Sequence, residues 1–398
     1  MERSRIKELK DIYEKELLVN VMPFWERYSI DREYGGYIHY LGTKGDIVGD
    51  DKMIWLEARE CWIFARLYNT LEKRPEWLDL AKHGYDFLRK YGFDSRGKMY
   101  FSVTREGLPL RMRRYYFSET FMIIAAAEYS RASGDWEAMD FARKLFERTC
   151  GYYFNPDPEL VPAKVDPATR PMTGHSVPMI LIATAQILRE CQDHTDEYDD
   201  LIYRLKDIIL TKFVKPEYKV LMETVAPDGS IIDTPEGRLL NPGHAIETSW
   251  FLMEESRYRG DTELLERALE ILEWSFERGW DRQFGGLYSF LDLKGYPPEK
   301  MEWDMKYWWP HNELLYASLL AHHLTGEKKY EEMFETAHRY SFDKFSDPEN
   351  GEWFGYLHRD GSVAMEVKGT MYKGAFHVPR QLLYTYKLLV EMDGNTQI

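Results

Sequence analysis

The chain has 398 residues, enough for two or three ordinary domains, and 44% of them are hydrophobic. The formal net charge is −15 without any block of basic residues, so we expect neither nucleic acid nor an anionic membrane as a partner. No apolar run approaches the roughly 18 residues of a membrane span, and segment 1–16 lacks the apolar stretch of a signal peptide. Three cysteines without metal-binding spacing, Cys61, Cys150 and Cys191, indicate reduced thiols in a cytoplasmic protein.

A unit of about 62 residues recurs six times along the chain. Its marker is a Gly-Gly-Tyr string or a relative of it, with one copy lacking the glycines near Tyr218 and a degenerate copy near Leu160. The even repeat, with no Pro/Gly/Ser-rich linker, predicts one domain over residues 1–398. The clear copies are Gly35-Gly36-Tyr37, Gly97-Lys98-Met99-Tyr100, Gly285-Gly286-Leu287-Tyr288 and Asn350-Gly351-Glu352-Trp353.

Each repeat contains two kinds of predicted helix. After a first helix at about 6–22, the amphipathic kind begins near residues 75, 135, 196, 261 and 327. In the segment 264–276 its apolar positions recur at steps of three and four residues, which is helical periodicity. The second kind is nearly apolar all round, as in 121–127, and begins near residues 55, 117, 178, 244, 310 and 377. A helix without a polar face is normally buried on every side.

Short alternating segments lie between these helices. The stretch 37–41 precedes Lys44-Gly45, and the stretch 221–225 precedes Asp228-Gly229, so both are predicted as β-hairpins. The expected fold is therefore all-α: an (α/α)6 barrel of six helix hairpins with small β-hairpins over one mouth. A linear helical solenoid is the rival architecture, but its end repeats would need polar caps, and the apolar helix near His377 has none.

Ionisable residues gather where the apolar helices begin. Pro242, Pro310 and Pro379 place several of them in first helical turns, because proline prefers that position. Singly, each has a structural explanation: a histidine in the core, an ion pair, or, for Glu119, a first-turn carboxylate. Together they would be costly to bury unless they converge on a wet pocket at one end of the barrel. The candidates are Arg59, His244 and Glu247, His311 and Glu313, and His377 and Arg380.

Several other chemistries have no motif in the sequence. There is no HExxH motif and no Cys/His cluster for zinc, and His244 with Glu247 and His377 is only a weak metal pattern. Neither a phosphate-binding glycine loop nor a nucleophile elbow is present. We therefore expect a site built from histidine, glutamate and arginine, with no required metal or cofactor.

The chain resembles the N-acylglucosamine 2-epimerase family, which is related to cellobiose and mannose 2-epimerases and to aldose–ketose isomerases. The resemblance covers nearly the full length and includes 55–59, 241–244 and 352–357. Two segments, 308–313 and 373–380, are similar to the N-acyl-sugar branch in particular. The resemblance to this family implies an (α/α)6 barrel in which His244 and His377 exchange the C2 proton of a sugar. Arg59, Glu247 and Glu313 match the family's other active-site groups.

Elementary chemistry agrees with these roles. Epimerisation at C2 removes a proton next to the ring-opened aldehyde and returns one to the opposite face, which two bases can do without a redox cofactor. Histidine suits both steps because its pKa lies near neutrality. The enolate that forms carries charge on O1, which a cation such as Arg59 can stabilise. We expect Glu247 to orient His244 or to assist ring opening, and Glu313 to do the same for His377. We group Trp309, His311 and Arg380 with the substrate-binding residues.

The predicted reaction is the interconversion of N-acetyl-D-glucosamine and N-acetyl-D-mannosamine. A close alternative is 2-epimerisation or aldose–ketose isomerisation of an unmodified sugar, and Ala58 and His175 depart from the pattern expected of an N-acyl-sugar site. More distant alternatives are an inverting glycoside hydrolase and a non-catalytic sugar-binding or protein-interaction scaffold. The resemblance also suggests ATP as an allosteric activator. The sequence does not decide whether the chain forms a homodimer.

Overall fold

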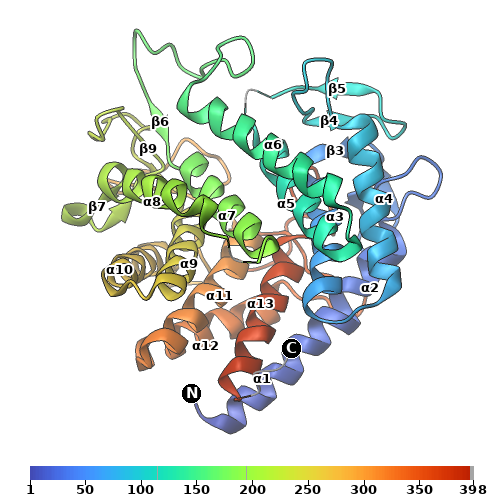
Figure 1. The fold of residues 1–398 in the computed structure, drawn as a ribbon. Coiled ribbons are helices and arrows are strands. Elements are labelled where there is room, and N and C mark those ends of the chain that lie inside the picture. The colour runs from blue at the N-terminus through green and yellow to red at the C-terminus, as the bar shows by residue number, and fades with distance from the viewer. Residues whose placement is uncertain (114, 194, 395–398) are drawn as a thin grey trace.

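The computed structural model describes residues 1–113, 115–193 and 195–394, and its helices form two concentric rings (Figure 1). The prediction of an (α/α)6 barrel is confirmed. The inner helices are apolar all round, and each begins within two residues of the predicted position. They are α3 (Ile54–Thr70), α5 (Phe117–Ser133), α7 (Ser176–Cys191), α9 (Pro242–Arg259), α11 (Trp308–Thr325) and α13 (His377–Met392).

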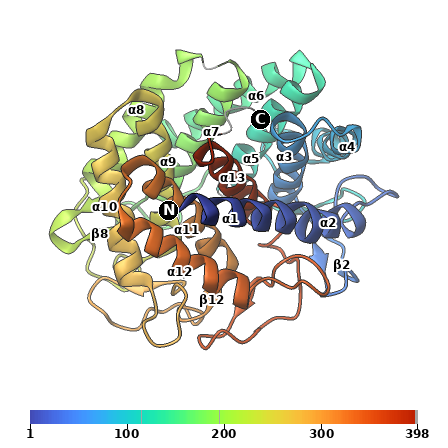
Figure 2. The same ribbon diagram turned by 90° about the horizontal axis from the view of Figure 1, so that it is seen from below.

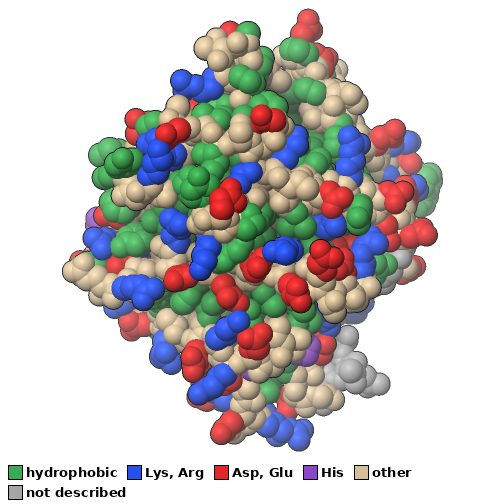
Figure 3. Space-filling model, turned by 90° about the vertical axis from the view of Figure 1, so that its left-hand side faces the viewer, with side chains coloured by type: hydrophobic (Ala, Val, Ile, Leu, Met, Phe, Trp, Pro, Cys, Tyr) green, Lys and Arg blue, Asp and Glu red, His purple; other side chains and the backbone are tan. Residues whose placement is uncertain are grey.

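The outer ring consists of the amphipathic helices, which turn an apolar face inward and a charged face to solvent. Figure 3 shows one such outer face, where acidic and basic side chains alternate between patches of apolar ones. The outer helices are α1 (Arg3–Lys15), α2 (Met22–Tyr28), α4 (Pro75–Tyr91), α6 (Trp136–Phe154), α8 (Asp199–Ile208), α10 (Thr262–Gly279) and α12 (Lys328–Lys344). Short helical turns are the π-helical η1 (Glu16–Val21) and η3 (Ile209–Phe213) and the 3₁₀ turns η2 (Asp196–Tyr198) and η4 (Pro216–Tyr218).

The first outer helix is longer than the sequence predicts. It runs through α1, η1 and α2 without interruption, and the widened π turn lies directly before Pro23. Proline cannot donate a backbone hydrogen bond and its ring clashes with the preceding turn of an α-helix. The N–H of Met22 bonds to the Leu17 carbonyl five residues back, which widens the turn and lets the helix continue.

Segments from the two ends of the chain close the ring. Figures 1 and 2 show α1 lying beside α13, and these two helices pack together. Helix α13 in turn packs against α3 and α11. On the loop side, Gly42 bridges to Val367, and the Leu41 carbonyl accepts the Lys368 N–H at 2.9 Å. The linear solenoid is therefore wrong, because no pair of end repeats is left uncovered.

The strands of the described residues are short and form small antiparallel sheets. In four of these sheets, a strand just before an inner helix pairs with a strand from the loop of the next repeat: β3–β4, β6–β9, β10–β11 and β12–β13. The strand pairs therefore lie at the mouth where the inner helices begin. The strands are β1 (Tyr40–Leu41), β2 (Ile47–Gly49), β3 (Lys52–Met53), β4 (Ser102–Val103), β5 (Pro109–Arg111), β6 (Thr173–Gly174), β7 (Val214–Lys215), β8 (Val220–Leu221), β9 (Thr224–Val225), β10 (Leu239–Leu240), β11 (Leu291–Asp292), β12 (Lys306–Tyr307) and β13 (Tyr356–Leu357).

Of the two predicted hairpins, one is found as expected. Strands β1 and β2 pair across Lys44-Gly45, whereas the next strand after Asp228-Gly229, β10, pairs with β11 and not with the stretch 221–225. Instead, β8 pairs with β7 and β9 with β6. Asp228-Gly229 closes only a tight turn, in which the Gly229 N–H bonds to the Ala226 carbonyl at 2.8 Å. The local turn is predictable from the sequence, but β9 pairs with β6, which lies in the preceding repeat.

Buried ion pairs hold the loops that carry the Gly-Gly-Tyr markers. In three repeats, a fully buried lysine from the end of a loop reaches back to an aspartate that follows the outer helix. Each such aspartate also accepts backbone N–H groups of its own turn, as Asp31 does from Glu33. These pairs are Lys52–Asp31 at 2.8 Å, Lys306–Asp281 at 3.2 Å and Lys368–Asp347 at 2.9 Å.

The marker glycines are required by close contacts at this mouth. Gly36 has φ +68°, and a Cβ there would lie 2.4 Å from the Glu57 carboxylate. That carboxylate accepts the Tyr37 N–H at 3.0 Å, and burial raises the pKa of Glu57 to about 8.

The three cysteines are all free thiols. Cys61 is buried, and Cys150 and Cys191 are half-buried. Among the described residues, no helix has the length and apolarity to cross a membrane.

Candidate active site

A cavity of about 880 Å³ opens at the mouth where the inner helices begin. Its floor and walls come from all six inner helices and from the loops above them. Five of the eight predicted site residues line it: Arg59, His244, Glu247, Trp309 and His377. The remaining three lie behind this surface.

The local sequence explains how α9 presents His244. Asn241 caps the helix, with its side-chain oxygen accepting the His244 N–H at 3.2 Å, and Pro242 occupies the first turn. Gly243 is needed because a Cβ there would lie 2.4 Å from the Trp309 ring. The missing side chain therefore lets Trp309 pack beside His244, with ring centroids 5.2 Å apart.

A carboxylate that the sequence did not single out holds His244. Nδ1 of His244 lies 3.0 Å from both oxygens of Glu223, which sits in the loop between β8 and β9. Burial lowers the pKa of His244, but the Glu223, Glu247 and Glu313 carboxylates together raise it further, so it ends above its ordinary value. The charge on His244 in turn holds the pKa of Glu223 far below its usual range, against the effect of burial. His244 is thus favoured as an imidazolium.

The second histidine, His377, is held in the neutral state. Nδ1 of His377 lies 2.7 Å from Glu313, whose same oxygen accepts a hydrogen bond from Arg380 at 2.6 Å. Burial, followed by the nearby Arg59 and Arg380 guanidinium groups, lowers the pKa of His377 well below its ordinary value. His377 is therefore neutral at pH 7, as a general base must be.

One aromatic ring contacts both histidines. The Trp309 ring centroid lies 5.2 Å from that of His244 and 5.7 Å from that of His377, with interplanar angles of 42° to each. Nε2 of each histidine makes no hydrogen bond with another described residue, whereas each Nδ1 is tied to a carboxylate. Two imidazoles from elements far apart in the chain thus line one cavity, and the Nε2 atom of each is free of hydrogen bonds to described residues.

Arg59 supplies a cation to the same cavity. Its guanidinium carbon lies over the rings of Phe121, Trp55 and Phe376, at 4.0, 4.3 and 4.6 Å from their centroids. It makes no ion pair with Glu57 or with any other described residue. Burial, followed by Arg380, lowers the pKa of Arg59 to about 9, so it remains charged at neutral pH. A caged guanidinium without a carboxylate partner is suited to bind an anionic oxygen.

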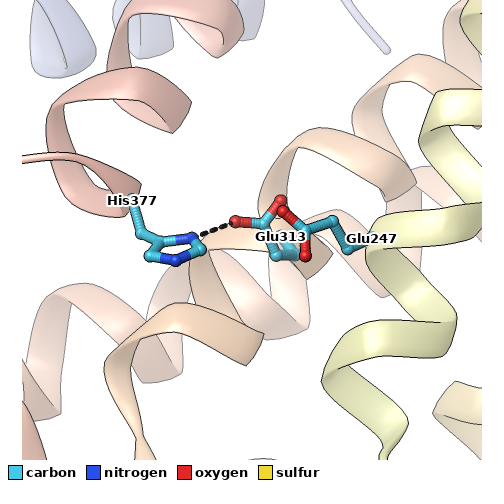
Figure 4. A group of neighbouring side chains, drawn as sticks. All are labelled: Glu247, Glu313 and His377. Carbon is cyan, nitrogen blue, oxygen red and sulfur yellow. Dashed lines mark hydrogen bonds and ion pairs between the residues drawn. The ribbon is translucent and has the colours of Figure 1, made fainter. Parts of the chain in front are cut away.

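Glu247, Glu313 and His377 lie close enough to hold a metal ion, with one ligand atom of each within 4.8 Å of the others (Figure 4). A cation already occupies the centre of this group. The Arg380 guanidinium donates to Glu247 at 3.0 Å and to Glu313 at 2.6 Å. This arrangement neutralises the carboxylates and favours a fixed ion network over a metal site.

The geometry can be compared with known proteins. Residues 36–377 match the family described as N-acylglucosamine 2-epimerase (GlcNAc 2-epimerase). The chain is 35% identical to an N-acylglucosamine 2-epimerase from Bos taurus over 396 residues, 98% of this chain and 93% of that protein. It is 27% identical to a cellobiose 2-epimerase from Dictyoglomus turgidum, over 96% of this chain and 99% of that protein.

The chain belongs to the N-acylglucosamine 2-epimerase family. The fold agrees: a solved cellobiose 2-epimerase from Bacillus thermoamylovorans superimposes with a TM-score of 0.82 at 20% identity, covering 96% of this chain and 99% of the other. The family and the carbohydrate isomerase class expected from the sequence are confirmed. The roles of the individual site residues rest on the geometry described above.

His311 does not lie in this cavity, contrary to its grouping with the substrate-binding residues. It is fully buried, its Nε2 accepts the Leu287 N–H at 2.8 Å, and its Nδ1 lies 2.6 Å from the Tyr307 carbonyl. Burial lowers the pKa of His311 to about 3. It occupies the place that Glu57 has in the first repeat, where it holds a marker loop.

Arg380 and Glu313 also lie behind the cavity surface and position the groups that face it. Glu247, predicted to orient His244, bonds instead to Arg380, and Glu223 holds His244. His175 is buried behind Glu223, with its Nε2 2.8 Å from the Thr248 hydroxyl, and so does not reach the sugar cavity. No helical or metal-binding pattern marks Glu223, which lies within the alternating stretch 221–225 that suggested a hairpin.

Proposed function

We propose that this protein catalyses the reversible C2 epimerisation of N-acetyl-D-glucosamine and N-acetyl-D-mannosamine. The proposal is carried by one observation: two imidazoles with free Nε2 atoms and opposite pKa shifts line one cavity. The substrate class comes from the family and from the 35% identity to N-acylglucosamine 2-epimerases over nearly the whole chain.

In the proposed mechanism, the ring-opened sugar lies between the two histidines. Neutral His377 removes the C2 proton through Nε2, and the electron pair moves into an enolate between C1 and C2. Protonated His244 then delivers a proton to the opposite face of C2. His377 is now charged and His244 neutral, so the reverse reaction or exchange with water resets the pair. Such positioned acid–base groups contribute about 10²–10⁴-fold each.

Arg59 is assigned to the oxygen that gains charge. Deprotonation at C2 places negative charge on O1, and a fixed guanidinium in a largely apolar cavity stabilises that charge strongly. The aromatic cage of Trp55, Phe121 and Phe376 restricts the guanidinium, so little reorganisation is needed as the charge develops. The reaction is redox-neutral, so this chemistry requires no cofactor.

The cavity walls are compatible with an acetamido group. Met179, Ile180 and Phe117 line the same cavity with apolar side chains, against which an acetyl methyl group can be buried. Because His175 is buried outside the cavity, it does not weigh against this substrate as the sequence suggested. ATP activation, a cytoplasmic location and a homodimer stay predictions.

An unmodified sugar is the alternative substrate, favoured by the similarity to cellobiose 2-epimerases. An inverting hydrolase would need two carboxyl groups flanking a glycosidic bond. Among the described residues, only Glu247 and Glu302 line the cavity as carboxylates, and Glu247 is committed to Arg380. Paired histidines therefore favour proton exchange over hydrolysis.

The test is a panel of reducing sugars followed by NMR, with and without ATP. N-acetyl-D-glucosamine should give N-acetyl-D-mannosamine with the highest kcat/KM, and the reverse reaction should reach the same equilibrium mixture. Preference for glucose, mannose or cellobiose, or formation of a ketose, would instead establish the alternative. Release of monosaccharide from an oligosaccharide, or no turnover of any sugar, would contradict epimerisation altogether.

A further inference from the structure

A second cavity, of about 330 Å³, lies deeper in the barrel, on the far side of the active-site floor. It is lined by later turns of the inner helices, and it shares Phe121 and Ile180 with the active-site cavity. Arg380 lines the deeper cavity while bonding to Glu313 and Glu247. The mechanism proposed above makes no use of this cavity, which we call the distal cavity.

One face of helix α13 extends from the active-site cavity to the distal cavity. His377, Arg380, Tyr384, Lys387 and Glu391 recur at steps of three and four residues, so they share one face of the helix. His377 faces the active-site cavity, and the other four line the distal cavity. The face of α13 that carries a catalytic group at one end therefore carries an ammonium group ten residues further on, about 15 Å along the helix.

Each of the four arginines that line the distal cavity has a carboxylate partner, and some of these partners lie just behind the lining. Five cationic side chains and three acidic ones line the cavity. Two of the acids are neutralised by bidentate contacts: Glu190 by Arg66 at 2.8 and 3.0 Å, and Glu391 by Arg257 at 2.6 and 2.8 Å. The third acid, Glu254, accepts a hydrogen bond from a tyrosine, and burial raises its pKa, which favours the uncharged form.

Lys387 has no partner within this arrangement. Its ammonium group forms no hydrogen bond or ion pair with another described residue. Burial, followed by the charge of Arg66, lowers the pKa of Lys387 to about 8, so the group is still largely protonated at neutral pH. The Nε atoms of Arg66 and Arg380 are buried donors that likewise lack a partner among the described residues. Lys387 is half-buried, and an anion bound in the cavity would stabilise its unpaired ammonium group.

The remaining walls are flat and apolar. Trp62, Phe251, Tyr316 and Tyr384 line the distal cavity together with several aliphatic side chains. Aromatic walls of this kind stack against a ring, whether the apolar face of a sugar or an aromatic ring. Concave, mostly apolar sites with a few placed charges are typical of small-molecule binding.

We propose that the distal cavity binds a small anion made of one ring bearing a carboxylate. Lys387 pairs with the carboxylate, and the aromatic walls hold the ring. The inference is independent of the epimerase reaction, because none of the groups assigned to proton transfer contacts this ligand.

The test is calorimetric titration of the full chain with two carboxylates, methyl β-D-glucuronide and benzoate, which distinguish a sugar ring from an aromatic ring. Their neutral counterparts, methyl β-D-glucoside and benzyl alcohol, serve as ligand controls. We expect saturable binding of at least one carboxylate, at least tenfold tighter than its neutral counterpart. Lys387→Met, which keeps the length of the side chain but removes the charge, should weaken that binding at least tenfold.

Lys328→Met is the matched protein control, because that lysine side chain is 81% exposed on the outer helix α12. It should bind the carboxylate as the wild type does, and both variants should retain wild-type epimerase kinetics and thermal stability. Equal binding of neutral and anionic ligands, unchanged binding to Lys387→Met, or no saturable binding of either carboxylate would overturn the proposal.

Discussion

The two histidines differ because different charges surround them. His244 faces a carboxylate that no arginine shares, whereas the carboxylate at His377 also bonds to Arg380. An ion pair with an unshared carboxylate stabilises the imidazolium, whereas a neighbouring guanidinium disfavours it. The resting enzyme therefore holds one acid and one base, which is the arrangement that transfer between the two faces of a carbon requires.

Replacing Glu223 by glutamine tests this difference. The amide keeps the shape but removes the charge, so the pKa of His244 should fall by about one to three pH units. NMR titration of the imidazole resonances measures this directly. In the direction where His377 is the base, activity should decline with rising pH earlier in Glu223→Gln than in the wild type, because His244 loses its proton sooner.

The raised pKa of His244 also makes the stability of the folded protein depend on pH. The folded pKa of His244 lies above its unfolded value of about 6.5, so the pair adds stability fully below that pH and loses it as the pH rises through the folded pKa. Glu335→Gln, on the outer helix α12, is the control and should leave the His244 titration unchanged. An unshifted His244 pKa in Glu223→Gln would rule out the proposed pairing.

At the scale of elements, a glycine at the start of α9 affects the geometry of the active site. Gly243 lies in the first turn of the helix, and its missing side chain makes room for the Trp309 ring of α11. The ring in turn contacts both imidazoles. A single methyl group at residue 243 should therefore disturb the site without preventing the helix from forming.

We expect Gly243→Ala to lower kcat/KM on the order of 10²-fold, since a displacement near 1 Å at a positioning group has that effect. Thermal unfolding should show a folded protein, and tryptophan fluorescence should report the moved ring. Gly151→Ala in α6 is the matched control, because nothing lies within 4 Å of its added Cβ. It should leave activity unchanged and add about 0.5–1 kcal/mol of stability. Unaltered kinetics in Gly243→Ala would show that Trp309 does not position the site.

The helices were predictable because their signals are local. An inner helix without a polar face and an outer helix with one can be read from periodicity, and proline marks three of the starts. Glu223 and the pairing of β9 with β6 were not predictable, because local periodicity does not show which residues a loop contacts. The position of His311 outside the cavity could have been predicted from the repeat, because Glu57 and Glu119 accept the equivalent backbone N–H groups of Tyr37 and Met99.

At the scale of the whole molecule, closure of the ring creates the site. α9 and α13 do not follow one another in the chain, and α11, which lies between them, contributes Trp309 and Glu313. Because every inner helix begins at the same mouth, their first turns meet around one cavity. The deeper turns of the same helices form the distal cavity, so one barrel presents two chemically different environments along its axis.

The central claim is that His244 and His377 act on opposite faces of the same C2 atom, and proton exchange in heavy water tests it most directly. With N-acetyl-D-glucosamine, the wild type should form N-acetyl-D-mannosamine that carries deuterium at C2. His244→Asn and His377→Asn should each lose interconversion by at least 10²-fold. Each variant should still exchange the C2 proton of one sugar, and the two variants should act on opposite sugars. Product that keeps its original C2 hydrogen, or either variant epimerising at the wild-type rate, would contradict the account.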